Sequence, residues 1–310
     1  MKTLGEGNTP LVESSSNQDL YYKNEGINPT GSFKDRGTAL TVEKALEQDV
    51  ENLHICSSGN AALSLAVYCQ KAGIDCICHI PQKTSEGKKQ LMKAFGADLK
   101  EYDAIYEKIF HHLQDAELEG WNVTPGAADI SMQAYEEIAS EIIKDGIEPD
   151  QVIVPCGNGT NLAGIWQGFK SHGLEPEMIG VQIEGSSPIK KALEEEIKHG
   201  VVEDPGESMA EGIIASESFN CAEAVKAIKE SSGCLETVEE CEIEKGMNDL
   251  MKEGVVCEPT SAIVKPVSEK YSGTTVAVIT GSGLKNHDKI KKISGSQQKG
   301  NSAFNSWSEY

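Results

Sequence analysis

Short apolar runs alternate with helical patterns along the chain, and this alternation constrains the fold more than any other feature of the sequence. Strands are predicted at residues 53–56, 76–80, 99–102, 121–124, 151–155, 178–183 and 275–280. Helices are predicted at residues 60–72, 85–95, 132–144 and 161–169, between 102 and 121, and around 247. Because a helix between two strands brings them side by side in parallel, we expect an α/β fold of mostly parallel sheets flanked by helices.

Length and composition narrow the class of protein. A chain of 310 residues is long enough for two domains. Its 49 acidic and 28 basic residues give a net charge of −21, and no lysine-rich run offers a surface for nucleic acid. No stretch is long enough to cross a membrane, and the N-terminus lacks the apolar core of a signal peptide. We therefore expect a cytoplasmic protein that acts on a small molecule.

The cysteines argue against disulfides and against a metal site. There are nine of them, an odd number, and none forms a C-x-x-C pair, which favours reduced thiols. Cys76, Cys78 and His79 lie together in a predicted strand, where alternate residues point to opposite faces. This spacing does not suit a metal, so none is expected.

The basic residues include a single arginine, Arg36, beside 27 lysines. A guanidinium binds a carboxylate or a phosphate through two parallel hydrogen bonds, whereas a lysine acts as a point charge. Any forked contact of this kind must therefore use Arg36.

The densest chemical motif surrounds that arginine and reads Asn28-Pro29-Thr30-Gly31-Ser32-Phe33-Lys34-Asp35-Arg36-Gly37. Pro29 and Gly31 predict a turn, and Ser32 is placed to cap a following helix. Lys34 then falls in the first helical turn, where the helix dipole disfavours a cation. The position favours a neutral amine, which a Schiff-base lysine needs.

Two further motifs lie where a predicted strand gives way to a helix. The first, Ser57-Ser58-Gly59-Asn60, offers hydroxyls, backbone N–H groups and an amide that suit a carboxylate, although a capped helix start explains it equally well. The second is a glycine loop that can cradle a phosphate, Gly157-Asn158-Gly159-Thr160-Asn161. Leu162 excludes the dinucleotide pattern G-x-G-x-x-G there.

A fourth motif, Thr280-Gly281-Ser282-Gly283-Leu284-Lys285, places hydroxyls at the carboxyl end of the last strand. Together the motifs supply a lysine for a Schiff base, an amide for a ring oxygen, a glycine loop for a phosphate and a hydroxyl for a ring nitrogen. These groups fit pyridoxal 5′-phosphate as the cofactor.

The chain resembles the threonine synthase branch of the fold-type II, tryptophan-synthase-like enzymes that use this cofactor. The resemblance begins at the opening motif Gly5-Glu6-Gly7-Asn8-Thr9-Pro10-Leu11 and ends at Lys285. It runs through blocks in the family's order at residues 28–37, 57–60, 157–161, 253–262 and 280–285.

The resemblance implies roles for individual residues. Lys34 would form the internal aldimine and move protons, with Phe33 packed beside the cofactor. Asn60 would lie near the cofactor's 3′-oxygen and Thr280 at its pyridine nitrogen. The cofactor's phosphate would be held by Gly157, Asn158, Gly159, Thr160 and Asn161.

The resemblance also implies a discontinuous layout and a homodimer. Residues 1–47 and 146–292 would form a large cofactor-binding domain, and residues 48–145 a small, mobile substrate-binding domain. Residues 293–310, rich in Ser, Gln, Asn and Gly, are expected to be a disordered tail.

The substrate pattern departs from the family. Its members release the phosphate from O-phosphohomoserine and add water to give threonine, and bind that phosphate with a threonine after the loop asparagine, an Asn-Ser pair and an arginine. Here Ala61 follows Asn60, Val123 follows Asn122, and residues 123–141 contain no arginine. Lys83 and Lys88 are candidates to replace these contacts, or they merely solvate a surface helix. The substrate-binding set is then Ser57, Ser58, Gly59, Asn60, Lys83, Lys88 and Asn122.

Four functions therefore stay open. The first is a threonine synthase with a rebuilt phosphate pocket. The second is a threonine or serine dehydratase, whose substrate has no phosphate. The third is a replacement enzyme for O-phosphoserine, similar to cysteate synthase, and the fourth is a cofactor-binding homologue without turnover.

Overall fold

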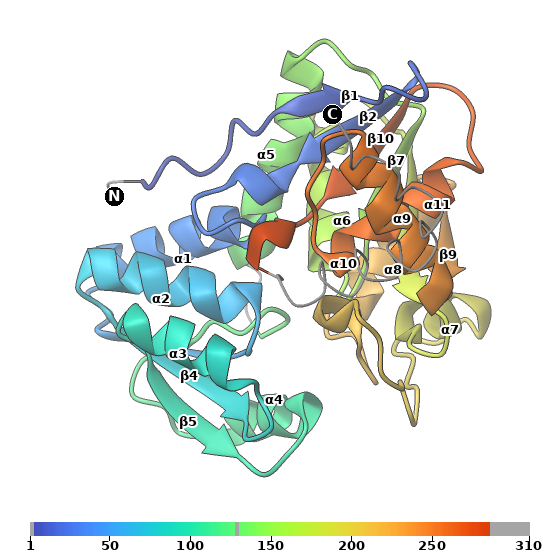
Figure 1. Cartoon of the computed structure of the whole chain (residues 1–310). Helices are drawn as coiled ribbons and strands as arrows, with labels where there is room; N and C mark the ends of the chain where they lie inside the picture. Colours follow the sequence, from blue (N-terminus) through green and yellow to red (C-terminus); the bar gives the residue numbers. More distant parts are fainter. Residues whose placement is uncertain (1–2, 128–129, 286–310) are drawn as a thin grey trace, which may run out of the picture.

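The computed structural model describes residues 3–127 and 130–285 and contains two β-sheets (Figure 1). The larger sheet has the strand order β1-β2-β10-β7-β8-β9, and the smaller has the order β5-β4-β3-β6. The larger sheet consists of β1 (Leu11–Glu13), β2 (Leu20–Asn24), β7 (Gln151–Pro155), β8 (Glu177–Ile183), β9 (Cys234–Val238) and β10 (Thr275–Ile279). The smaller consists of β3 (Asn52–Cys56), β4 (Asp75–Pro81), β5 (Asp98–Tyr102) and β6 (Trp121–Asn122). Of these strands only β1 and β2 pair antiparallel, so the predicted α/β class is confirmed.

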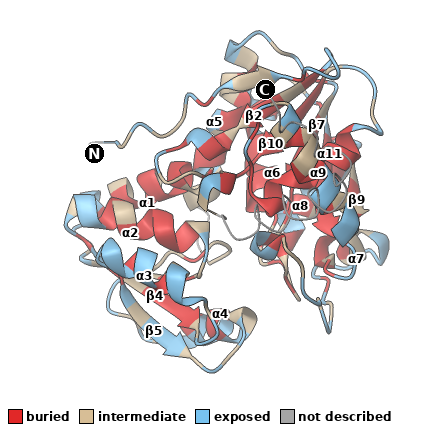
Figure 2. Cartoon of the chain, viewed as in Figure 1, coloured by how far each residue is buried: buried red, intermediate tan, exposed pale blue. Residues whose placement is uncertain are grey.

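Helices cover both faces of the larger sheet. One face packs against α5 (Ile130–Lys144), α6 (Thr160–Ser171), α7 (Pro188–Glu194) and α8 (Cys221–Glu230). The other packs against α9 (Glu240–Lys252), α10 (Pro259–Ala262) and α11 (Val264–Ser268). In β7, Val152 and Val154 face the first group of helices while Ile153 faces the second, and all three are fully buried. This explains why the strand is a continuous apolar run, and Figure 2 shows the buried strands at the centre.

The smaller sheet packs mainly against α1 (Lys34–Glu47), α2 (Asn60–Ala72) and α3 (Glu86–Ala94) on one face. Its other face packs against α4 (Tyr106–Asp115). Three short 3-10 turns also matter below: η1 (Glu25–Ile27), η2 (Glu211–Ile213) and η3 (Gly283–Lys285).

Helices α1 and α5 lie where the two sheets meet (Figure 1). Ala39 and Val42 of α1 belong to the core of the smaller sheet, whereas Tyr135 and Ile138 of α5 belong to that of the larger. The two helices pack against each other. The domain division at 47 and 145 stays a prediction, and the predicted tail 293–310 lies outside the described residues.

The predicted elements match the observed ones to within a few residues at each end. The helix expected at 60–72 has those bounds and ends at Gly73, whereas the strand expected at 121–124 is shorter, Trp121–Asn122. No prediction covered β1, β2, β9, α7, α8, α10 or α11. None of the helices within 3–127 and 130–285 combines the length and apolar character that a membrane span requires.

The predicted chemical motifs gather because the carboxyl ends of parallel strands lie at one edge of a sheet. Residues 57–60 follow β3, residues 157–161 follow β7, and residues 280–285 follow β10. The backbone N–H of Phe33 donates to the carbonyl of Thr280 at 3.0 Å, and Ser32 forms a bridge with Gly281. These contacts seat the start of α1 against the end of β10.

Candidate active site

Lys34 is the first residue of α1 and lies among these strand-end loops. Burial lowers the pKa of its ammonium group to about 8, although Glu258 opposes this shift. The Nζ atom lies 4.5 Å from the centre of the Phe33 ring. The structure thus favours a neutral amine, as predicted, and burial is the main cause.

The turn before Lys34 is held by a carboxylate and not by the predicted serine cap. Asp35 accepts hydrogen bonds from the backbone N–H of Thr30 at 2.6 Å and from its hydroxyl at 2.5 Å. Ser32 does not cap the helix: Phe33 occupies the cap position, and the buried Ser32 hydroxyl has no partner in the described chain. The prediction was wrong because the chain turns back toward Gly281 at Ser32, where the two segments form a bridge.

Asn60, the first residue of α2, lies between two charged side chains. Its Nδ2 donates to Glu258 Oε2 at 2.9 Å, and its Oδ1 accepts from Lys285 Nζ at 2.7 Å. Burial raises the pKa of Glu258, while the charges of Lys285 and Lys34 oppose the rise. Two lysines therefore face one buried carboxylate beside the predicted cofactor amide.

Thr280 lies at the end of β10, where its buried hydroxyl is 2.9 Å from that of Ser261. The same serine accepts from the backbone N–H of Gly281 at 2.9 Å. A Cβ on Gly281 would approach the carboxyl group of Glu258 to 2.5 Å, so only glycine lets this carboxylate lie against the loop. The fourth motif thus brings a hydroxyl and a carboxylate to one place.

The glycine loop after β7 has the features of an anion site. No group in the described part of the chain accepts from the backbone N–H groups of Gly157, Asn158, Gly159, Thr160 or Asn161. Both polar atoms of the Asn161 amide are buried without a partner there. Gly159 has φ +89°, and a Cβ on it would lie 2.7 Å from the carbonyl of Asn220.

These features fit pyridoxal phosphate, as far as the described residues show. Unpaired N–H groups at the start of α6 suit its phosphate, and an unpaired buried amide of this kind is rare without a ligand. The lysine of lowered pKa suits its aldehyde. The roles of the individual residues stay predictions.

The loop at 57–60 leaves groups available for a substrate. The hydroxyl of Ser57 accepts from the backbone N–H of Gly59 at 3.2 Å, and both Ser57 and Ser58 are partly exposed. Such hydroxyls at a helix start suit a carboxylate.

The predicted phosphate contacts are further apart. Lys83 is exposed, and Lys88 pairs with Glu211 of η2 at 2.6 Å. The Asn122 amide accepts from the hydroxyl of Thr124 at 2.7 Å. The described residues thus show Lys88 and Asn122 already engaged.

Arg36 forms ion pairs, as predicted, and is fully enclosed. Its guanidinium donates two hydrogen bonds to Glu25, at 2.7 and 2.8 Å, and two to Glu141, both at 2.7 Å. The side chains of Arg36 and Glu25 have no exposed surface. Lys23 of β2 also contacts Glu141 at 2.7 Å, so the single arginine is bound within the scaffold.

Glu258 and Lys285 are the functional candidates that sequence reasoning missed. Both stand in blocks that carry the resemblance, but neither was given a role. The available signal was a charged residue directly after an apolar run, Glu258 after 255–257 and Lys285 after β10 and its glycine loop. Such positions place charge near a strand end.

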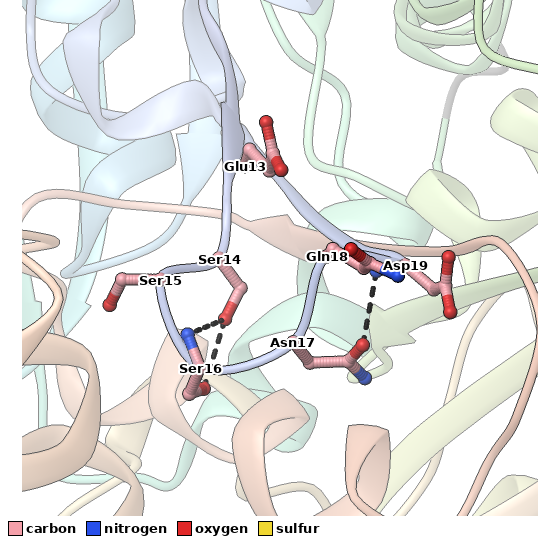
Figure 3. A pocket seen from close by; sticks show the side chains of 7 residues that line it. All are labelled: Glu13, Ser14, Ser15, Ser16, Asn17, Gln18 and Asp19. Carbon is pink, nitrogen blue, oxygen red and sulfur yellow. Dashed lines mark hydrogen bonds between the residues drawn. The ribbon is translucent and has the colours of Figure 1, made fainter.

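Two other features lie away from these loops. Residues 13–19, between β1 and β2, line an open hollow, and Figure 3 shows their side chains on one turn. In β4, the thiols of Cys76 and Cys78 lie 3.7 Å apart on one face. Within 3–127 and 130–285, no three His, Cys, Asp or Glu residues are grouped to hold a metal.

Comparison with known proteins agrees with this geometry. The model of a family described as pyridoxal-phosphate dependent enzyme matches residues 2–281. The threonine synthase of Halalkalibacterium halodurans is 34% identical over 306 residues, which cover 91% of this chain and 84% of that protein. That of Methanocaldococcus jannaschii is 33% identical over 312 residues, 92% of this chain and 77% of that protein.

Solved structures share the fold. A bacterial threonine deaminase, from the organism abbreviated T.th., superposes with a TM-score of 0.76 at 25% identity and covers 88% of this chain and 92% of that one. Maize serine racemase superposes with a TM-score of 0.78 at 18% identity, over 94% of this chain and 93% of that one. With the lysine, the glycine loop and the family match together, the chain belongs to the pyridoxal-phosphate dependent enzymes of fold type II, and to their threonine synthase branch.

Proposed function

We propose that this chain is a threonine synthase, a lyase that converts O-phosphohomoserine and water into threonine and phosphate. Similarity to curated threonine synthases over nine-tenths of the chain carries the proposal. The amine of Lys34, whose pKa is lowered to about 8, supports it at the level of chemistry.

The cofactor supplies an aldehyde and an electron-accepting ring when it is bound. In this proposal Lys34 attaches it covalently and moves protons at the substrate's carbon atoms, because a buried, largely neutral amine both attacks and accepts protons. Phe33 packs beside the ring, and Asn60 binds the 3′-oxygen. The loop 157–161 binds the phosphate through its unpaired N–H groups and the Asn161 amide.

The proposed partner of the ring nitrogen is the Thr280 hydroxyl, which Ser261 contacts at 2.9 Å. A hydroxyl does not hold the ring protonated as a carboxylate would, so the ring is a weaker electron acceptor. Elimination and replacement fit such a ring better than transamination.

For the substrate, Ser57, Ser58 and Gly59 are proposed to bind the α-carboxylate at the start of α2. Lys83, Lys88 and Asn122 are the proposed phosphate ligands. Because Lys88 pairs with Glu211, it would have to exchange that carboxylate for the phosphate. Lys83, which is exposed, has no such competitor among the printed contacts of the described chain.

A second candidate is a dehydratase that acts on unphosphorylated threonine or serine. One observation favours it: the only arginine is enclosed by Glu25 and Glu141 and is not available to a substrate phosphate. The likeness to threonine deaminase agrees with this alternative.

A steady-state assay with O-phosphohomoserine, O-phosphoserine, threonine and serine separates the candidates. Release of phosphate together with threonine from the first compound supports the synthase. Release of keto acid from threonine, with no turnover of O-phosphohomoserine, contradicts it and supports the dehydratase. Lys83→Ala and Lys88→Ala should raise KM for the phosphorylated substrate while the affinity for cofactor stays unchanged.

We also propose that the enzyme works in the cytoplasm as a homodimer, with a small domain at residues 48–145 that moves. All nine cysteines are free thiols, which suits a reducing compartment. Exposed ion pairs such as Lys88 with Glu211 join the two sheets, and pairs of this kind break at little cost.

A further inference from the structure

Lys285 is a cation at the site to which the proposed function gives no role. It ends η3, directly after the loop that follows β10. Its ammonium group donates to the carbonyls of Thr30 and Gly31, at 3.0 and 3.1 Å, and to Asn60 Oδ1 at 2.7 Å. All three of its donors are therefore used, and by two segments that lie on either side of Lys34 in space.

The chemistry of the ammonium group fixes which way the Asn60 amide points. A lysine side chain has three donors and no acceptor, so the Asn60 atom that it contacts must be the oxygen. The amide nitrogen then points the other way, to Glu258 Oε2 at 2.9 Å. The orientation of this amide thus depends on a residue from another part of the fold.

The charges around Lys285 also favour a fixed position. Glu258 and Asp35 both act on it electrostatically, while burial lowers the pKa of its ammonium group. Asp35 in turn holds the turn before Lys34 through Thr30. Removing Lys285 would leave two partly or fully buried carboxylates with less compensating charge.

We propose that Lys285 is a positioning residue that orients the Asn60 amide toward the 3′-oxygen of pyridoxal phosphate and ties the turn before Lys34 to the start of α2. This rests on the proposed roles of Asn60 and Lys34. It assigns Lys285 to the cofactor and not to the substrate phosphate, because its donors are occupied and two carboxylates lie close to it.

The test is a titration of the full-length apoenzyme with pyridoxal phosphate, followed by visible absorbance. Lys285→Met should raise the dissociation constant about tenfold, the size of a hydrogen bond lost from a charged site, and shift the absorbance maximum. Asn60→Ala should do the same. The double variant should be no weaker than the weaker single variant, because both remove one arrangement.

Two further variants separate this from a general structural role. Lys285→Arg keeps the charge and should restore much of the affinity and the wild-type absorbance maximum. Lys265→Met removes a buried lysine that pairs with Glu253 at 3.0 Å, outside the site. It should lower the unfolding temperature of the apoenzyme while the cofactor's dissociation constant and spectrum stay unchanged.

The proposal is overturned if Lys285→Met binds cofactor with unchanged affinity and spectrum, or if its effect and that of Asn60→Ala simply add. A rise in KM for a phosphorylated substrate with normal cofactor binding would also overturn it and assign Lys285 to the substrate. If Lys285→Met does not fold, Lys285→Gln is measured by the same criteria. No substrate is needed for the titration, so its result is independent of whether the enzyme makes threonine.

Discussion

Three consecutive charged residues at the start of α1 are placed out of bulk water for different reasons. Lys34 has a lowered pKa and is the proposed reacting group. Asp35 binds the backbone of the turn that presents it. Arg36 is enclosed by two glutamates and fixes the helix to its surroundings. The sequence motif is dense because each residue meets a separate physical requirement.

Glu258 controls the charge state of Lys34, because its carboxylate raises the pKa that burial lowers. Glu258→Gln should therefore lower the pKa of Lys34 below about 8. At pH 7 the fraction of neutral amine would rise, and the apoenzyme should form its covalent link to the cofactor about fourfold faster. Stopped-flow absorbance at several pH values measures this rate.

Glu253→Gln is the matched control, since that carboxylate pairs with Lys265 away from Lys34. It should leave the pH profile of the rate unchanged. A Glu258→Gln profile that overlays the wild type would show that Glu258 does not set the charge of Lys34.

The residues of the site divide into those that local pattern reveals and those that it does not. Lys34 and the loop 157–161 could be predicted because turn residues and helix starts are local signals. Glu258 and Lys285 could not be given roles, since their significance comes from Asn60, far away in the sequence, lying between them. The missing Ser32 cap has the same origin, a contact with Gly281.

At the scale of elements, strands β3, β4 and β5 carry a chain of ring contacts on one face. His54 Nδ1 lies 3.0 Å from His79 Nε2, and His79 Nδ1 lies 2.8 Å from the Tyr102 hydroxyl. Burial, and then the charge of His54, lowers the pKa of His79 to about 4. The smaller sheet therefore requires His79 to be neutral.

This requirement makes the stability of the fold depend on pH. Because the pKa of His79 is lower in the folded than in the unfolded chain, its contribution is present above about pH 6.5 and is lost as the pH falls toward 4. Between pH 7 and 5 the free energy of unfolding should fall by about 2 kcal/mol on this account. His79→Asn should remove that part of the decrease. Urea unfolding at the two pH values compares the two proteins, and equal decreases would contradict the assignment.

The elements that could be predicted are those with uniform burial. Strands β7 and β10 are buried on both faces and read as apolar runs, and α2 ends at a glycine. Strand β2 was missed because it contains Lys23, a fully buried lysine that Glu141 and the carbonyl of Thr9 neutralise or bind. Strand β1 has only three residues, too few for a periodic signal.

At the scale of the whole molecule, the cluster around Arg36 joins segments from both sheets. It brings together η1 through Glu25, α1 through Arg36, β2 through Lys23 and α5 through Glu141. Burial alone would raise the pKa of Glu141, but hydrogen bonds and charge from Arg36 and Lys23 lower it to about 2. The cluster is therefore ionised at neutral pH and its charges are paired.

Glu25→Gln should destabilise the protein by about 3–5 kcal/mol, because it leaves a buried guanidinium with one carboxylate fewer. Glu137→Gln is the matched control: that side chain is 69% exposed and its contact with Arg36 is 3.5 Å long, so its loss should cost less than about 1 kcal/mol. Denaturant unfolding of the two variants measures the difference. Equal losses would show that the buried pair contributes no more than the exposed one.

The pairing of β2 with β10 has a consequence for how the chain is made. Leu20 pairs with Thr275, so the N-terminal strands find their parallel neighbour only after nearly the whole described chain has been synthesised. At about 5–20 residues per second, a ribosome needs tens of seconds to cover that interval. During this time the smaller sheet, whose strands all lie between Asn52 and Asn122, has every partner it needs. Synthesis thus favours an order in which the smaller sheet folds first and the start of the chain waits to close the larger one.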